Sequence, residues 1–209
     1  DPNKEAEYRD EVYTQDAPFT GKANPLTRTI NRFGGISWGN SKTAIVYDYW
    51  WNTRNSKTYL INPSKHTAKP EVIFDRNYQD RYSDPGNFVT RKNEFGRYVL
   101  ATKKNKAYLL GDGYTKEGKF PFVNQIDLKS KKTSTLYRSS YTDKVEDIQY
   151  AININKGEIL VRLEAKDEYP NYYIRNIKKK NNLEAITQFE NPFKSIQNVH
   201  KEVIKYKRD

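Results

Sequence analysis

A repeated hairpin is the feature that most constrains the fold of this chain. Each copy has a strand of aromatic and aliphatic residues, then Asn or Asp, a Lys-rich turn, and a second strand that ends in an aromatic residue. The three copies are Thr58–Phe74, Phe122–Tyr137 and Tyr172–Phe189. Their spacing is near the period of antiparallel propeller blades and outside that of helical arrays. The sequence therefore predicts a repeated β fold.

Short β-rich runs between turn signals extend each hairpin toward a set of four strands. The first set is 32–38, 43–51, 57–61 and 72–74. The second set is 88–90, 97–102, 107–110, 122–128 and 133–137. The third set is 148–152, 158–163, 172–177 and 183–187. No helix of ten residues is indicated before Phe193, although 194–201 could form a short one.

These sets predict an all-β chain, a partial β-propeller of about three to four four-stranded antiparallel blades. Propellers need roughly four to eight blades, so the chain would not close a ring by itself. The predicted divisions are a polar lead-in with a possible outer strand of a preceding blade (1–27), three blades (28–75, 76–140 and 141–190) and a linker (191–209). The second blade includes a long loop at 111–120.

The charge of the chain invites a nucleic-acid interpretation, but its distribution argues against one. The net charge is +11, from 37 Lys and Arg against 26 Asp and Glu. Lysines gather in predicted turns, including 129–132 and 178–180, where β proteins place solvated charge. No basic helix, RNA-binding aromatic signature or zinc-finger spacing accompanies them. No apolar run approaches the roughly 18 residues of a membrane helix. We predict no nucleic-acid partner and no membrane partner.

One motif suggests catalysis. The run 35–39 (GISWG) matches G-x-S-x-G, the nucleophile elbow of α/β-hydrolases, with Ser37 as the serine. That elbow needs a helix directly after the serine, whereas the residues that follow read as a turn and a β-strand. We therefore expect Ser37 to lie beside small residues on an inner blade strand and predict no catalytic residue in this chain.

The remaining chemistry-bearing residues also favour structural roles. The chain has no Cys, which excludes disulfides, thiolate metal sites and cysteine nucleophiles. The two histidines, His66 and His200, lie in polar or charged segments without a second ligand at metal spacing. No carboxylate pair lies in the apolar setting that acid and base roles require. We expect no metal and no cofactor.

Particular residues resemble a known family. They include Ser37–Trp38, the run 44–47, the run 72–76, the final segment 201–209 and, most specifically, 80–86 (DRYSDPG). These segments resemble the last propeller blades of prolyl oligopeptidase family serine peptidases. The branch they resemble contains glutamyl endopeptidases and acylaminoacyl-peptidase-like enzymes. The resemblance runs from about Leu26 to the end of the chain.

The resemblance implies a division of labour. In that family the strand corresponding to 202–207 leads into an α/β-hydrolase domain with a Ser-Asp-His triad. The parent polypeptide would then be a serine peptidase, and these residues a non-catalytic propeller portion that restricts and positions peptides. Its partners would be peptide substrate, the hydrolase domain and the remaining blades. The family favours a secreted, periplasmic or organellar location, which the residues themselves do not specify.

An acidic substrate preference would require cations that face the substrate chamber. Arg54, Arg76 and Arg81 are the candidates, since a guanidinium can bind a carboxylate with two hydrogen bonds. The alternative is that these arginines form structural ion pairs within or between blades.

Two other functions are open at this stage. One is a free-standing propeller-like interaction module that binds protein or polyanion, and the other is a serine hydrolase that uses Ser37. A partial propeller also leaves an inter-blade face uncovered, so we expect the isolated chain to self-associate.

Overall fold

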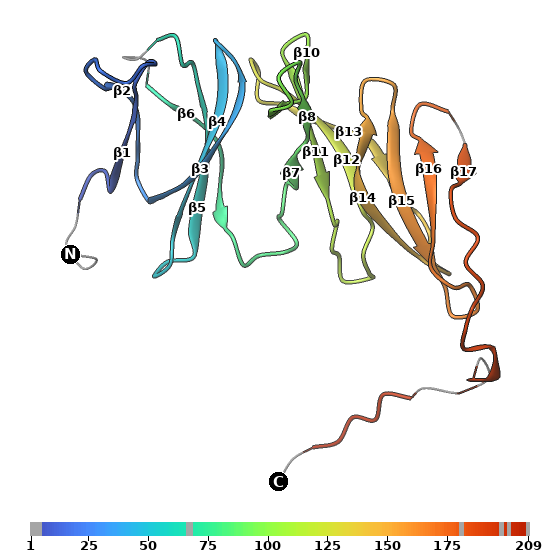
Figure 1. Ribbon diagram of the computed structural model, residues 1–209. Coiled ribbons are helices and arrows are strands. Elements are labelled where there is room, and N and C mark those ends of the chain that lie inside the picture. The colour runs from blue at the N-terminus through green and yellow to red at the C-terminus, as the bar shows by residue number, and fades with distance from the viewer. Residues whose placement is uncertain (1–5, 66–68, 180–181, 197–198, 200–201, 208–209) are drawn as a thin grey trace.

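The chain folds into a row of antiparallel β-sheets that pack face to face (Figure 1). The computed structural model describes residues 6–65, 69–179, 182–196, 199 and 202–207. Three larger sheets follow one another along the chain, and we call them blades 1, 2 and 3. Within the described residues, no helix is long and apolar enough to cross a membrane.

Blade 1 contains four strands whose spatial order is their order in the chain. They are β3 (Arg32–Asn40), β4 (Thr43–Trp50), β5 (Asn55–Ile61) and β6 (Glu71–Asn77). The β-branched and aromatic residues of β4 suit a central strand. Ala44, Ile45 and Val46 are fully buried there, which means that both faces of this strand are covered. The four strands match those predicted from the first repeat.

In blade 2, two short strands take the place of a single innermost strand. Its continuous strands are β11 (Lys106–Gly111), β12 (Phe122–Asp127) and β13 (Thr133–Arg138). Two short strands, β7 (Asn87–Phe88) and β10 (Thr102–Lys103), pair with opposite halves of β11. Between these two short strands the chain makes an inserted hairpin.

The inserted hairpin contains β8 (Thr90–Lys92) and β9 (Tyr98–Leu100), which pair only with each other. The prediction of one blade strand over 97–102 is therefore wrong. The physical reason is the turn before it. The Asn93 side chain accepts hydrogen bonds from the N–H groups of Phe95 and Arg97 and folds the segment back onto β8.

Blade 3 is again a four-stranded sheet in chain order. Its strands are β14 (Val145–Asn153), β15 (Glu158–Glu164), β16 (Asn171–Asn176) and β17 (Leu183–Ala185). In β15, Ile159, Val161 and Leu163 are buried while the residues between them are not. This period of two places alternate side chains on opposite faces of the sheet.

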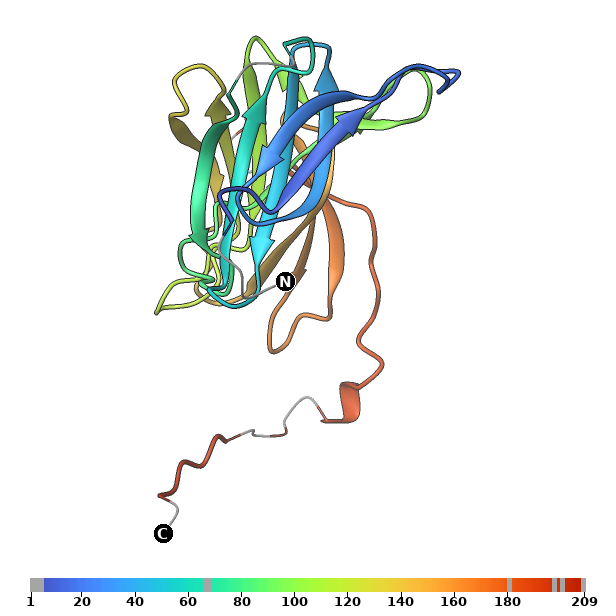
Figure 2. The ribbon, with the colours of Figure 1, turned by 90° about the vertical axis from the view of Figure 1, so that its left-hand side faces the viewer.

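A two-stranded sheet covers the outer face of blade 1. It consists of β1 (Asp10–Thr14) and β2 (Asn24–Thr29), and β2 was not predicted from the sequence. Leu26 of β2 packs against Ala44 and Val46 of β4. At the other end of the chain, the residues after β17 extend away from the sheets and include one 3-10 turn, η1 (Lys194–Ile196) (Figure 2).

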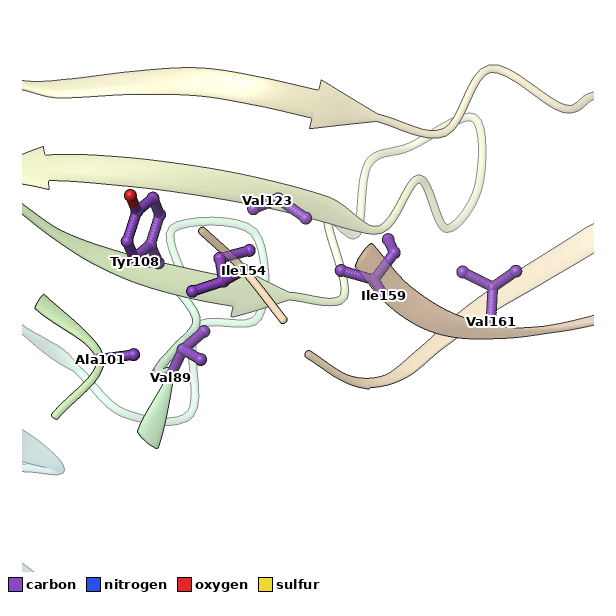
Figure 3. Close-up of a cluster of buried hydrophobic side chains, with 7 residues drawn as sticks. All are labelled: Val89, Ala101, Tyr108, Val123, Ile154, Ile159 and Val161. Atoms are coloured by element: carbon purple, nitrogen blue, oxygen red, sulfur yellow. The ribbon is translucent and has the colours of Figure 1, made fainter. Parts of the chain in front are cut away.

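Two apolar layers hold the blades together. Val89, Tyr108 and Val123 of blade 2 pack against Ile159 and Val161 of blade 3 (Figure 3). Leu109 and Ile126, also from blade 2, lie in a second cluster with residues of blade 1, namely Leu60, Ile73 and Phe74. Blade 2 is therefore buried on both faces, and blades 1 and 3 do not share a cluster.

This arrangement is a partial β-propeller. Successive antiparallel sheets pack face to face, and in each sheet the first strand in the chain lies at one edge, as in propeller blades. Among the described strands none joins blade 1 to blade 3, so the row is open (Figure 1).

Strand direction sorts the connections into two ends. The upper end in Figure 1 holds the connections between first and second strands and between third and fourth strands: residues 41–42, 62–70, 104–105, 128–132, 154–157 and 177–182. The lower end holds the connections between second and third strands and from one blade to the next: residues 51–54, 78–86, 112–121, 139–144 and 165–170. The C-terminal segment leaves from the lower end.

Candidate functional site

The three candidate arginines all lie at the lower end of the blades. Arg54 is in the turn between β4 and β5, Arg76 is near the end of β6, and Arg81 is in the connection between blades 1 and 2. The N–H of Tyr78 donates a hydrogen bond of 2.8 Å to the Arg54 carbonyl. This contact fastens the β4–β5 turn to the start of the connection.

Arg76 has mainly structural partners. Its Nη2 donates to the Asp80 carbonyl and lies 3.6 Å from an Asp84 carboxylate oxygen. The side chain is only 16% exposed. Its Nε is buried and has no hydrogen-bond partner among the described residues. Arg76 thus helps to fix the connection between blades while one polar atom keeps its capacity to donate.

Arg54 and Arg81 are stacked on aromatic rings. The Arg54 guanidinium lies 3.7 Å from the Trp51 ring centroid, and the Arg81 guanidinium lies 3.7 Å from that of Tyr114. Stacking fixes the plane of a guanidinium while leaving its N–H edge available. Within the described part of the chain, Arg81 makes no ion pair. Of the three candidates it is therefore the best placed to meet an external carboxylate.

The connection between blades 1 and 2 is held by its own side chains. Asp80 accepts from the N–H of Tyr82, and Asp84 accepts from the N–H of Gly86. The hydrogen bond from the Ser83 side chain is the main cause that lowers the pKa of Asp80. Such local bonds favour one loop conformation, so Arg76 and Arg81 are presented by a defined segment.

Two cavities open beside this connection. One, of about 560 Å³, lies between the inner strands of blades 2 and 3, and the other, of about 360 Å³, lies between blades 1 and 2. Asp84, Gly86, Asn87 and Phe88 line both cavities. The segment that precedes blade 2 therefore forms the common wall of the two cavities.

The larger cavity has an aromatic side chain on each flank. Tyr98 comes from the inserted hairpin and Tyr150 from β14, and they are 68% and 55% exposed. Thr90, Asp112 and Gln149 add polar groups to the wall. The wall thus combines aromatic residues with polar groups, and a concave surface of this kind can hold a ligand. Neither tyrosine was predicted, because the sequence does not show that the inserted hairpin reaches β14.

The smaller cavity contains both Arg76 and Ser37. Ser37 lies within β3, and its hydroxyl accepts a hydrogen bond of 3.3 Å from Tyr47. Burial raises the pKa of the Tyr47 hydroxyl, so this residue remains a neutral donor rather than a base. The strand continues to Asn40 and turns into β4, as expected for a residue that is not on a nucleophile elbow. His66 and His200 lie outside the described residues.

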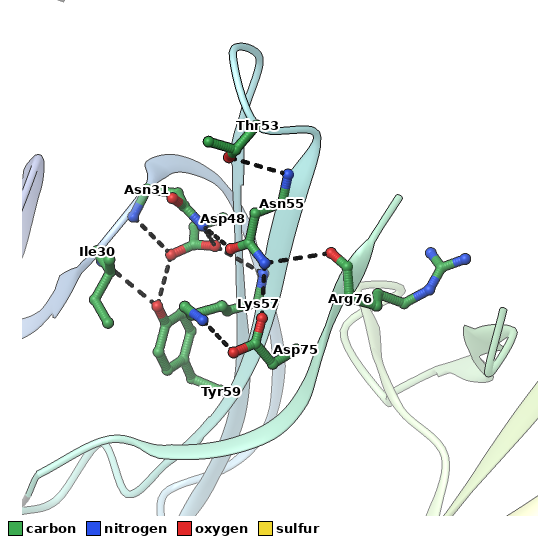
Figure 4. Close-up of polar contacts among 9 residues, drawn as sticks. All are labelled: Ile30, Asn31, Asp48, Thr53, Asn55, Lys57, Tyr59, Asp75 and Arg76. Carbon is green, nitrogen blue, oxygen red and sulfur yellow. Dashed lines mark hydrogen bonds and ion pairs between the residues drawn. The ribbon is translucent and has the colours of Figure 1, made fainter. Parts of the chain in front are cut away.

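A buried polar network fixes the lower end of blade 1 (Figure 4). Asp48 is 3% exposed and accepts hydrogen bonds from the Asn31 N–H and side chain, the Lys57 N–H and the Tyr59 hydroxyl. Burial, together with the bond to Asp48, raises the pKa of Tyr59. Asn55 extends the network toward the Arg76 carbonyl. The network therefore connects β4 and β5 to β6 beside Arg76.

A second buried network supports blade 3. The Arg175 Nε donates to the fully buried carboxylate of Glu146 at 2.8 Å. Tyr137 of blade 2 also donates to Glu146, and Tyr141 accepts from Arg175. Burial raises the pKa of Tyr137. This network joins blades 2 and 3 through structural hydrogen bonds.

The described residues of the lower end offer groups that can bind and position a ligand. Ser37 contacts Tyr47 rather than an acid or base. Among the described residues, no group of three His, Cys, Asp or Glu side chains could hold a metal ion. What the lower end offers is two cavities, oriented guanidinium groups and exposed aromatic rings.

Comparison with known proteins gives the chain its context. No family model matches it. It is 31% identical over 223 residues to the "Probable glutamyl endopeptidase, chloroplastic" of Oryza sativa subsp. japonica, with 100% of the chain covered. The protein of the same name from Arabidopsis thaliana is 30% identical, again over 100% of the chain. The chain resembles one segment of the glutamyl endopeptidases.

The chain spans about a quarter of the length of these glutamyl endopeptidases, 24% of the rice protein and 23% of the Arabidopsis protein. Among solved structures, TolB from Acinetobacter baumannii aligns with 90% of the chain and 39% of its own, with a TM-score of 0.42 and 14% identity. The propeller assignment rests on the sheets themselves. The likeness to glutamyl endopeptidases agrees with the resemblance expected from residues 80–86.

Proposed function

We propose that this chain is the non-catalytic propeller portion of a prolyl oligopeptidase type serine peptidase. The observation that carries the proposal is the similarity of the whole chain to one segment of glutamyl endopeptidases. The partial propeller and its lower-end cavities support a role in restricting and positioning peptides for a downstream Ser-Asp-His domain. The proposed reaction of the parent protein is peptide bond hydrolysis.

A serine-directed fluorophosphonate probe tests the division of labour. The full-length protein should be labelled at a serine outside residues 1–209, and the isolated chain should remain unlabelled. Ser37→Ala in the full-length protein should leave labelling unchanged. Labelling of the isolated chain that disappears with Ser37→Ala would overturn the proposal in favour of an independent hydrolase.

The arginines provide the test of substrate positioning. In the full-length enzyme we expect Arg81→Gln to raise KM for a peptide with Glu at the cleavage site several-fold more than for a matched Gln peptide. Arg54→Gln and Arg76→Lys extend the test to the other candidates. Arg28→Gln is the control, because Arg28 pairs with Glu11 in the two-stranded sheet. Equal changes for both peptides would contradict a role in carboxylate recognition.

A further inference from the structure

The two ends of the blades differ sharply in charge. Every one of the six connections at the upper end contains lysine, and none contains Asp or Glu. Ten of these lysines are described and all are exposed: Lys42, Lys65, Lys69, Lys104, Lys129, Lys131, Lys132, Lys156, Lys178 and Lys179. Among the ion pairs of the described residues, only Lys131 of this set takes part, with Glu71. We call these ten residues the lysine end.

The lower end is nearly balanced in charge. Its five connections contain seven acidic residues: Asp80, Asp84, Asp112, Glu117, Asp143, Asp167 and Glu168. They also contain six basic residues: Arg54, Arg81, Lys116, Lys119, Lys144 and Lys166. The net charge of +11 is therefore not spread evenly over the turns. It is concentrated where the alternating strand directions bring six separate connections to the same side (Figure 1).

Folding does not require this asymmetry. Asp is among the most favourable turn residues, and the lower-end connections use it repeatedly. Ten like charges on one side repel one another, with a range of about 8 Å at physiological ionic strength. A partner that carries negative charge would relieve this repulsion.

The types of side chain at the lysine end limit the chemical class of partner that it could bind. These connections contain no Arg, Phe, Trp or Tyr, whereas nucleic-acid surfaces that read or stack bases use Arg for base edges and rings for stacking. Leu128 and Ile154, two of their apolar residues, are buried, whereas surfaces that insert into a membrane interface expose apolar groups beside their lysines. Flexible ammonium groups spread over three blades instead suit carboxylates dispersed along a polypeptide.

We propose that the lysine end binds acidic polypeptide segments by electrostatic attraction. The surface lies opposite the cavities and arginines of the lower end and is not covered by the C-terminal segment, which leaves from the lower end (Figure 1). The inference rests on the proposed function for its purpose, since it names acidic chains as the class of peptide that the propeller gathers. The binding itself is a property of residues 1–209.

Binding to the isolated chain tests the inference. The probe is a rhodamine-labelled peptide of about 20 residues with alternating Glu and Gly, and the matched probe has Gln in place of Glu. Fluorescence anisotropy should show binding of the Glu peptide only. This binding should weaken strongly as the salt concentration rises from about 0.05 to 0.3 M.

A matched pair of variants locates the surface. Lys132→Gln combined with Lys179→Gln should weaken binding of the Glu peptide about tenfold. Lys116→Gln combined with Lys166→Gln removes the same charge from exposed lysines of the lower end and should change binding less than twofold. Circular dichroism spectra that match the unmodified chain show that each variant is folded.

Three outcomes would overturn the inference: equal weakening by the two variant pairs, equal binding of the Glu and Gln peptides, or tighter binding to single-stranded DNA or phosphatidylserine vesicles than to the Glu peptide. A different experiment decides the proposed function. If the full-length protein resists the fluorophosphonate probe, the peptidase assignment is lost, and acidic peptide binding by this chain is still decided by anisotropy.

Discussion

Gly86 lies where the backbone of the connection touches blade 2. Its φ is +86°, and a Cβ at this position would lie 2.4 Å from the Leu110 carbonyl oxygen. A positive φ and a backbone contact both require glycine, because neither the dihedral nor the neighbour can be changed by moving a side chain. This residue allows the common wall of the two cavities to approach β11.

Gly86→Ala should therefore reduce the free energy of unfolding by about 3 kcal/mol or more, since strain and steric overlap add. Gly96→Ala is a matched control. Gly96 has a φ of +72° and no atom near its Cβ position, so its substitution should cost only about 1 kcal/mol. Urea denaturation measures both values. Equal losses would show that the contact with Leu110 is not limiting.

Asp48 is a second residue whose role comes from its neighbours. It is buried and surrounded by donors only. Asp48→Asn would direct an amide NH₂ toward at least one of them, and we expect a loss of about 2–4 kcal/mol in unfolding free energy. Asp75→Asn, at a carboxylate that is 50% exposed and paired with Lys57, should cost less than about 1 kcal/mol. A small effect at Asp48 would mean that water satisfies these donors.

At the scale of the elements, the sequence pattern predicted where most blade strands lie, but it did not predict which strands pair. The β-rich runs of β4 and β15 between turn signals were sufficient to predict blade strands. The inserted hairpin could not be predicted, because Tyr98–Leu100 and Thr102–Lys103 together read as one strand. Only the pairing partners separate them. Likewise, each Lys-rich turn was visible in the sequence, but the side it faces depends on strand direction.

The candidate arginines show the same limit. Their residue type suggested carboxylate recognition, and the structure places all three at one end. The partners that distinguish them are set by the fold: Arg76 meets Asp84, whereas Arg81 meets the ring of Tyr114, far along the chain. Substrate contact by these arginines stays a prediction.

Blade 3 depends on the buried pair of Arg175 and Glu146. Arg175→Met should lower the free energy of unfolding by about 3–5 kcal/mol, because Glu146 would stay buried without its cation. Adding Glu146→Gln should recover a large part of this loss, since the unpaired charge is then removed. A double-mutant cycle by urea denaturation checks both statements. No recovery would show that the two residues act independently.

At the scale of the whole molecule, blade 3 is the last sheet of the row, and no further blade of the described chain packs on the face that points away from blade 2 (Figure 1). One cross-strand row on this face contains Leu160 and Ile174, opposite in direction to the buried Ile159 and Val161. An apolar sheet face of this kind favours association.

We therefore predict that the isolated chain self-associates at high concentration through blade 3. Ile174→Lys should shift the equilibrium toward monomer in sedimentation velocity experiments, since it places a charge in the apolar row. Val72→Lys, at an exposed position of β6 in blade 1, should leave the equilibrium unchanged. A chain that remains monomeric at high concentration would contradict this prediction.

The inserted hairpin of blade 2 has a consequence for how the repeats find one another. Blades with similar strands risk assembling in the wrong order during folding, as repeat proteins do. The hairpin contacts β3 of the neighbouring blade, where Leu100 lies against Gly39. Blades 1 and 3 have no such hairpin between their described strands. The inserted hairpin thus distinguishes blade 2 from the other two blades, and its contact with β3 favours the packing of blade 2 against blade 1.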